Sequence, residues 1–139
     1  MKNITEITIK NNIDKIQVVI AHFEEFGIKN SLSIDIMMKF NIALDEFLSN
    51  TIKYAFEGDE SEHDININFL IEDNQLITII EDDGKEFDPF GRNPPDTKIG
   101  LEERNIGGLG IHITKELMDD YSYVRHNGVN TITLVKNNV

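Results

Sequence analysis

The chain contains 139 residues, among them 13 Lys or Arg and 25 Asp or Glu, which gives a formal net charge of −12. Its length corresponds to one domain with a real core, and its 40% hydrophobic and 27% charged residues are typical of a globular protein. The absence of cysteine excludes disulfides, thiolate nucleophiles and cysteine-based zinc sites, and the acidic charge disfavours direct contact with nucleic acid or an anionic membrane.

No apolar run approaches the roughly 20 residues that cross a bilayer, and no apolar stretch follows the charged residues at the start of the chain. These features predict neither a membrane span nor a secretory signal. A chain without cysteine suits a reducing compartment, so the cytoplasm is the expected location. We expect a single domain over residues 1–139.

The first half of the chain predicts one strand and two helices. Glu6–Lys10 alternates apolar and polar residues with the two-residue period of a half-buried strand. Asn12 is suited to cap a helix whose apolar residues lie three and four positions apart, and Gly27 is its expected end. A longer helical pattern over Ser33–Phe56 follows, and Gly58 is expected to end it.

A hairpin and a long loop come next. Asp64–Ile71 and Leu76–Glu81 alternate again and flank a short turn, a pattern typical of two antiparallel strands. From Asp82 to Gly110 this periodicity gives way to most of the nine glycines and all three prolines. A loop of this length is unusual inside a compact domain, so we interpret residues from about 85 to 106 as a lid over a binding site.

The last part of the chain returns to regular structure. Leu109–Met118 has the spacing of a short helix, and Tyr121–Arg125 and Thr131–Lys136 predict strands around an Asn127-Gly128 turn. Strands interrupted by helices in this order predict an α+β fold. We expect a two-layer sandwich in which helices cover one face of a mostly antiparallel sheet and leave the other face more exposed.

Three short segments carry residue types suited to chemistry, and the first lies on the long helix. Glu46, Asn50 and Lys53 follow an i, i+4, i+7 spacing and therefore face the same region. Such a stripe is also typical of a solvated helix face with one ion pair. However, asparagine has a low helix propensity, and its side-chain oxygen is a suitable ligand for Mg²⁺.

The second segment follows the second hairpin strand, where Asp82 and Asp83 precede Gly84. Asp and Gly suit turns for purely local reasons, so a simple turn explains this pattern. The functional alternative is a carboxylate that accepts a hydrogen bond from the amino group of a ligand, with Gly84 allowing the ligand to approach closely. Phe87 and Pro89 would then form a wall of the pocket.

The third segment is a glycine-rich turn at the start of the last helix, formed by Gly107, Gly108, Leu109 and Gly110. Such a turn offers free amide N–H groups and the positive end of a helix dipole to phosphate, although many such turns only begin helices. It lacks the Lys and Ser/Thr of the P-loop, and no strand immediately precedes it, so neither standard nucleotide fingerprint applies. The four histidines are dispersed and are expected to be structural or surface residues.

As a set, the three segments resemble the motifs of a known superfamily. In chain order they resemble the N, G1 and G2 boxes of the Bergerat-type (GHKL) ATPases: Glu46-x-x-x-Asn50, Asp82-x-Gly84 and Gly108-x-Gly110. Within that superfamily, the small single-domain size, residues 43–46 through 54–55 and residues 107–111 look most like the anti-sigma factor serine/threonine protein kinases, and the resemblance covers nearly the whole chain. The chain departs from the wider superfamily at Glu86, where the G1 box often has a second glycine.

The resemblance implies a Bergerat-type ATP-binding sandwich with ATP and Mg²⁺ as cofactors. It implies that Asn50 ligates Mg²⁺, that Asp82 receives the adenine amino group and that Glu46 is the general base. Arg104 is the candidate for stabilising charge on the γ-phosphate, although it could instead pair with a neighbouring glutamate. The other positions expected to contact ATP are Lys53, Gly84, Phe87, Gly107, Gly108, Leu109 and Gly110.

The resemblance also implies partners. An anti-sigma factor kinase binds a sigma factor and phosphorylates a serine on a small antagonist protein, and a homodimer through the first strand or first helix is plausible. The alternative is a non-catalytic ATP-binding module that controls a partner signalling protein such as a phosphatase. The presence of Glu46 favours the kinase, because base catalysis needs a carboxylate at this position.

Overall fold

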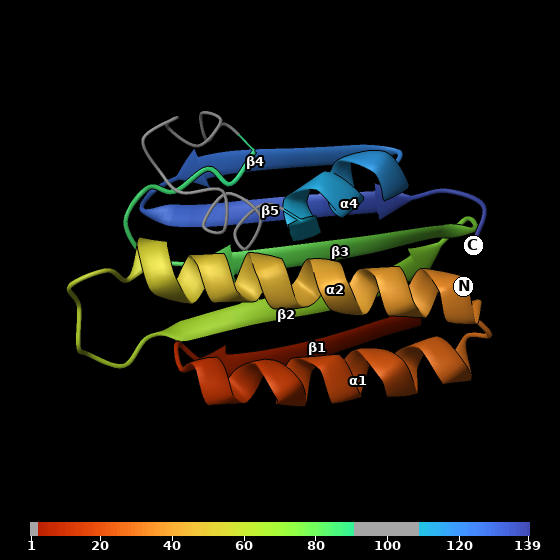
Figure 1. The fold of residues 1–139 in the computed structure, drawn as a ribbon, viewed down its shortest axis with the longest axis horizontal. Helices are drawn as coiled ribbons and strands as arrows, with labels where there is room; N and C mark the ends of the chain where they lie inside the picture. Colours follow the sequence, from red (N-terminus) through yellow and green to blue (C-terminus); the bar gives the residue numbers. More distant parts are fainter. Residues whose placement is uncertain (1–2, 91–108) are drawn as a thin grey trace.

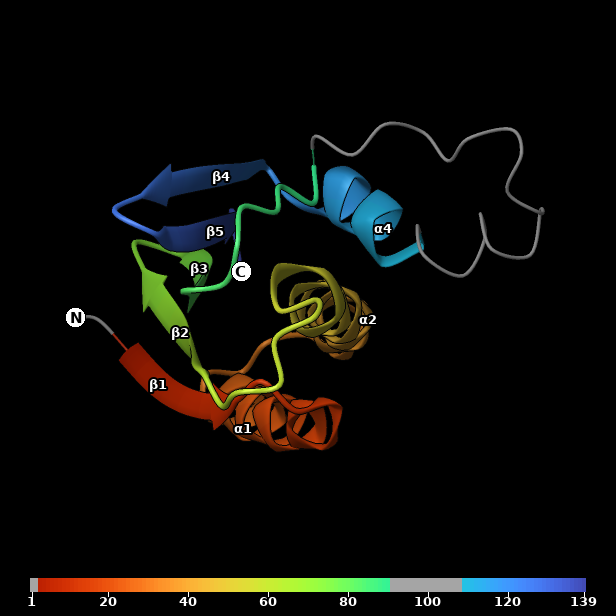
Figure 2. The ribbon, with the colours of Figure 1, turned by 90° about the vertical axis from the view of Figure 1, so that its left-hand side faces the viewer.

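The computed structural model describes residues 3–90 and 109–139 (Figure 1). The elements are β1 (Asn3–Lys10), the short 3₁₀ helix η1 (Ile13–Lys15), α1 (Ile16–Lys29), α2 (Ile34–Asn50), the π-helix η2 (Thr51–Ala55), β2 (Asp64–Glu72), β3 (Gln75–Asp82), α4 (Leu109–Leu117), β4 (Asp120–His126) and β5 (Val129–Lys136). The five strands form one antiparallel sheet in the order β1-β2-β3-β5-β4, and the helices lie on one face of it (Figure 2). The predicted two-layer α+β sandwich is therefore confirmed.

Alternation along the strands creates the buried face of the sheet. Ile67 on β2 lies between Ile7 on β1 and Ile80 on β3, and Ile80 lies opposite Ile132 on β5. All four side chains are buried. Because side chains alternate between the two faces of a strand, this single apolar row fixes the register of four strands relative to the helices above them.

Aromatic side chains join the two layers. Phe23 of α1 stacks on Phe40 of α2 at a ring-centroid distance of 5.4 Å, and its centroid lies 5.0 Å from that of Phe69 on β2. All three rings are fully buried. The start of α2 is fixed by Ser33, whose Oγ accepts a hydrogen bond from the Ile36 N–H at 3.2 Å. No helix in the described ranges is long and apolar enough to span a membrane.

Two helix boundaries differ from the sequence prediction. Gly27 does not end the first helix, because α1 continues to Lys29 and the chain turns at Ser31 with a φ of 57°. A Cβ atom on Gly27 would lie 2.9 Å from the Met37 sulfur, so this glycine serves the contact between α1 and α2. The long helix is regular only to Asn50 and then widens into η2, while the predicted stop at Gly58 has the expected positive φ of 78°.

The second face of the sheet carries no helix among the described residues (Figure 2). An apolar row crosses this open face, since the strand register places Ile4, Leu70, Ile77 and Val135 side by side. Ile4 is 60% exposed, and the other three are partly exposed. The open face is therefore more exposed than the helix-covered face, as predicted, but it is not uniformly polar.

Candidate functional site

The first predicted segment lies near the end of α2. Asn50 is only 6% exposed, and its amide nitrogen donates a hydrogen bond to Glu46 Oε1, one helical turn earlier, at 3.2 Å. An amide that turns its nitrogen toward the carboxylate directs its oxygen elsewhere. Because an amide oxygen is a hard ligand, the Asn50 side chain fits the role of an Mg²⁺ ligand.

The second segment places a buried carboxylate at the end of β3. Asp82 is 5% exposed, and its Oδ1 accepts hydrogen bonds from the Gly84 N–H and from Asn130 Nδ2, both at 2.9 Å. Burial raises the pKa of Asp82 above its ordinary value, while these two hydrogen bonds act in the opposite direction. Within the described part of the chain Oδ2 receives no hydrogen bond, so it fits an amino group of a ligand.

Gly84 packs directly against the end of η2. A Cβ atom at this position would lie 2.6 Å from the Ala55 carbonyl oxygen, and the next residue, Lys85, donates its N–H to that oxygen at 2.9 Å. Only glycine permits so close an approach without a shift of the backbone. The contact joins the turn after Asp82 to the helical segment that follows Asn50, so the fold brings the first two predicted segments together.

Aromatic and cationic groups flank this junction. Phe87 stacks on Tyr54 with a centroid distance of 5.2 Å and an interplanar angle of 28°. Lys53 Nζ lies 5.2 Å from the centroid of the same Tyr54 ring, the geometry of a cation–π contact. The wider turn of η2 moves Lys53 out of the register that a 3.6-residue period predicts. Its contact with ATP therefore stays a prediction.

The third segment is described only in part. Leu109 and Gly110 begin α4, which packs beside α2 (Figure 2), whereas Arg104, Gly107 and Gly108 lie outside the described residues. Most of the predicted lid, over 85–106, also lies outside them. Its beginning is packed on the core, since Phe90 has ring-centroid distances of 5.4 Å to Phe47 and 4.8 Å to Tyr121.

A group of side chains on the β4–β5 hairpin completes the site and was not predicted. Asn130 is 1% exposed, and besides Asp82 it contacts Lys85, Arg125 and Tyr123. The sequence predicted the hairpin, but nothing in it marks Asn130 as special. Only the register reveals the group, because it places Asn130 directly opposite Asp82.

His63 is a second residue that sequence reasoning left as merely structural or on the surface. Its Nε2 lies 2.8 Å from Asp59 Oδ2, and its Nδ1 lies 3.0 Å from Asp83 Oδ1, next to the buried Asp82. Loss of water from around the ring acts to lower the pKa of His63, but Asp59 and Asp83 outweigh it and raise this pKa. His63 thus ties the loop before β2 to the end of β3.

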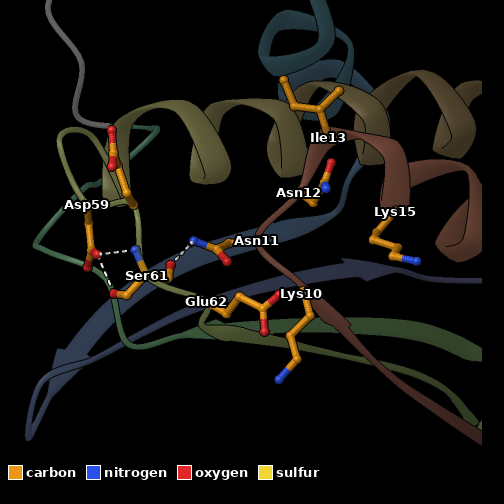
Figure 3. Close-up of a pocket in the computed structure, with 9 residues that line it drawn as sticks. Lys10, Asn11, Asn12, Ile13, Lys15, Asp59, Ser61 and Glu62 are labelled. Atoms are coloured by element: carbon orange, nitrogen blue, oxygen red, sulfur yellow. Dashed lines mark hydrogen bonds between the residues drawn. The ribbon is translucent and has the colours of Figure 1, made fainter.

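A cavity of about 490 Å³ lies away from these segments, between the end of β1 and the loop before β2 (Figure 3). It is open to solvent and contains none of the predicted site residues. Its walls carry both signs of charge, with no buried charged side chain. The lining residues are Lys10, Asn11, Asn12, Ile13, Lys15, Asp59, Glu60, Ser61 and Glu62. This cavity gives no indication of the chemistry that the three segments predict.

In the two ranges that the structure describes, no cluster of three or more His, Asp or Glu side chains is arranged to hold a metal ion. A site built from protein carboxylates and imidazoles is therefore not found there. The site residues fit a metal that takes one amide oxygen from the protein and its other ligands from phosphate and water, which is common for Mg²⁺.

Residues 9–136 match the family model of the histidine kinase-like ATPase domain. The chain belongs to this family. Two curated relatives are both named serine-protein kinase RsbW. The protein from Listeria monocytogenes is 32% identical over 104 residues, which is 72% of this chain and 66% of the relative. The protein from Staphylococcus epidermidis is 29% identical over 108 residues, which is 75% of this chain and 67% of the relative.

The fold of this histidine kinase-like ATPase domain also matches a solved structure. The RsbU and RsbW domains of a Mycobacterium tuberculosis protein superpose with a TM-score of 0.70 and 16% identity, covering 97% of this chain and 32% of that one. At this identity the match shows the fold alone. The family model and the RsbW relatives confirm the resemblance to an anti-sigma factor kinase of the GHKL superfamily. The matched part spans about two-thirds of the curated relatives' length.

Proposed function

We propose that the chain is an ATP-binding serine/threonine protein kinase of the anti-sigma factor type. It binds a sigma factor and transfers the γ-phosphoryl group of ATP to a serine on a small antagonist protein. The observation that carries the proposal is the junction of two segments at Ala55, where the turn after Asp82 meets the helix that bears Glu46 and Asn50. Membership of an ATPase family and similarity to named serine-protein kinases support it.

In this proposal Asp82 recognises the nucleobase. Its Oδ1 is occupied by hydrogen bonds from Gly84 and Asn130, which leaves Oδ2 to accept a hydrogen bond from the adenine amino group. Gly84 packs against Ala55 on the side where a Cβ would lie, so it would contact the base through its backbone. Phe87, supported by Tyr54, would form an aromatic wall.

The phosphates require charge compensation, because the chain carries a net charge of −12. When bound, Mg²⁺ neutralises phosphate charge, and the Asn50 side-chain oxygen would be its protein ligand. Backbone amides at Gly107, Gly108, Leu109 and Gly110 would cradle the phosphates at the start of α4. Lys53 and Arg104 would supply positive charge, Arg104 at the γ-phosphate.

Glu46 would be the general base. Its Oε1 accepts the hydrogen bond from Asn50, which orients the carboxylate and leaves the other oxygen to take the proton of a serine hydroxyl. The serine oxygen then forms a bond to the γ-phosphorus, while the bond from that phosphorus to the bridging oxygen of ADP breaks. ADP leaves with the electron pair.

The alternative is a non-catalytic ATP-binding module that controls a partner such as a phosphatase. The same hydrogen bond between Glu46 and Asn50 favours it, because a carboxylate that only holds Asn50 in place needs no further role. In either case the chain would act in the cytoplasm, which its lack of cysteine supports. We also propose a homodimer, supported by the exposed apolar row on the open face of the sheet.

The deciding experiment incubates the purified protein with labelled ATP, Mg²⁺ and candidate antagonist proteins, and compares the parent with Glu46→Ala and Glu46→Gln. The kinase proposal expects label on a partner serine with the parent and none with either variant. ATP binding without transfer to any candidate would favour the regulatory module. The absence of ATP binding would contradict both proposals.

A further inference from the structure

The side-chain amide of Asn130 has all of its hydrogen-bonding positions filled. Its Nδ2 donates to Asp82 Oδ1 and to the Lys85 carbonyl oxygen, both at 2.9 Å. Its Oδ1 accepts from Arg125 Nη1 at 2.8 Å and from the Tyr123 hydroxyl at 2.5 Å. An asparagine amide offers two donor hydrogens and two acceptor lone pairs, so none remains for a ligand. Asn130 therefore acts on the site only through its neighbours.

Arg125 and the Lys85 carbonyl oxygen together determine which way this amide faces. A guanidinium group can only donate hydrogen bonds, so the group within 2.8 Å of Arg125 must be the amide oxygen. The NH₂ group of Asn130 is then turned toward Asp82. The same Arg125 nitrogen donates to the Gly84 carbonyl oxygen at 2.9 Å, which holds the turn after β3 against the β4–β5 hairpin (Figure 1).

We propose that Arg125 and Asn130 are positioning residues that fix the Asp82 carboxylate and thereby select a purine with an amino group at position 6. The inference rests on the proposed function, because it assumes that Asp82 faces the base. Two donors hold Oδ1, so the carboxylate cannot rotate freely, and Oδ2 meets the base as an acceptor. An acceptor in this position attracts the amino group of adenine and repels the 6-oxo group of hypoxanthine.

The geometry also explains why two residues are needed. If Arg125 were removed, the Asn130 oxygen would keep only the Tyr123 hydroxyl as a partner, so the amide that donates to Asp82 would be held less firmly. If Asn130 were removed, Arg125 would keep its contact with Gly84 but lose its connection to the carboxylate. Both changes weaken the hold on the Asp82 carboxylate, and neither replaces a residue of the segments proposed to bind phosphate.

The test measures dissociation constants for Mg-ATP and Mg-ITP by calorimetry, because ITP has a 6-oxo group and a protonated N1 where ATP has a 6-amino group and an unprotonated N1, and is otherwise identical. The variants are Arg125→Met, Asn130→Leu and the conservative Arg125→Lys. Val124→Ala is the matched control, because this side chain is 56% exposed and lies on the other face of β4. Urea unfolding of each variant verifies that it is folded.

The parent is expected to prefer ATP to ITP by about 30-fold or more, since a site built for one hydrogen-bond pattern rejects its opposite. Arg125→Met and Asn130→Leu are expected to lower that ratio at least about 10-fold, chiefly through weaker ATP binding, while Val124→Ala keeps it. Arg125→Lys should recover part of the ratio, because a lysine still donates to one of the two oxygens.

Unchanged ATP preference in folded Arg125→Met and Asn130→Leu would overturn the inference. Equal weakening of ATP and ITP would also overturn it, since that result indicates a structural role alone. If Asn130→Leu fails to fold, the Arg125 variants still test the inference. Arg125 lies on β4, an edge strand of the sheet, where a substitution disturbs the core less. A parent that binds neither nucleotide would instead contradict the proposed function.

Discussion

At the scale of single residues, Glu46 and Asn50 have roles that substitution should separate. Asn50→Ala removes the amide oxygen that would ligate Mg²⁺, so it should weaken Mg²⁺-dependent ATP binding by about 30-fold, or about 2 kcal/mol. Glu46→Ala leaves that oxygen in place, so ATP binding should change by less than about 3-fold while phosphoryl transfer disappears. Calorimetry with Mg²⁺ and with a chelator measures the binding.

Ser49→Ala serves as the control on the same helix, because its hydroxyl lies 3.5 Å from Asp45 and away from the Glu46–Asn50 pair. It should bind Mg-ATP as the parent does. If Asn50→Ala also binds Mg-ATP as tightly as the parent, the assignment of Asn50 as the metal ligand is wrong.

His63 predicts a pH dependence of stability. The pKa of His63 is higher in the folded protein than in the unfolded chain, where it is near 6.5. The charged ring therefore stabilises the fold fully below the unfolded pKa, and this contribution is lost as pH rises through the folded pKa. The parent should therefore gain stability over His63→Gln at about pH 6 but not at about pH 9. Urea midpoints at the two pH values measure the difference.

The stability measurements stay above about pH 5 so that Asp59, the partner of His63, keeps its charge. Hydrogen bonds from Ser61 and, to a smaller extent, from His63 lower the pKa of Asp59. The contribution of that carboxylate is lost only when pH falls through its lowered pKa, which is a separate transition. If the parent were more stable than His63→Gln by the same amount at both pH values, the prediction would be wrong. The His63 ring would then stabilise the fold by packing on Phe56, and its charge would not contribute.

At the scale of elements, two glycines hold neighbouring segments together in different ways. A Cβ on Gly84 would lie 2.6 Å from the backbone oxygen of Ala55, whereas a Cβ on Gly27 would meet the flexible end of Met37 at 2.9 Å. Gly84→Ala must move η2 away from β3, so it should lower the free energy of unfolding by about 1–3 kcal/mol. Gly84→Ala should also weaken ATP binding.

Gly27→Ala provides the comparison. Alanine in a helix interior gains about 0.5–1 kcal/mol over glycine, and Met37 can adjust its rotamer, so this variant should be near neutral. Urea unfolding measures both variants. If Gly84→Ala were as stable as the parent, the turn after β3 and η2 could separate without cost, and the close contact at Ala55 would not be important for stability.

At the scale of the whole molecule, the open face of the sheet predicts self-association. Ile4 is 60% exposed in the apolar row on that face, and Ile28 is 73% exposed on α1. If the dimer forms through the sheet, Ile4→Lys should raise the dimer dissociation constant about 10-fold or more, while Ile28→Lys should not. Light scattering over a concentration series measures the mass. The reverse result would assign the interface to the first helix.

Patterns in the sequence alone were enough to predict the elements and most of the motif. Two-residue alternation predicted β1, β2 and β3, because it depends only on which face of a strand each side chain occupies, and the Asn127-Gly128 turn marked β4 and β5. The order of elements predicted the sandwich, and the superfamily was indicated by three short patterns taken as a set: Glu46-x-x-x-Asn50, Asp82-x-Gly84 and Gly108-x-Gly110. Each short pattern depends on residues close together in the chain, and only the order of these patterns extends over its whole length.

The way in which the site is supported follows from contacts between distant segments. Asp82 and Asn130 are 48 positions apart, and their hydrogen bond depends on the register between β3 and β5. The role of Gly27 likewise depends on the approach of α1 to α2, which helix-stop statistics do not describe. A contact between distant segments is fixed by packing and register across the whole sheet, and no local pattern contains that information.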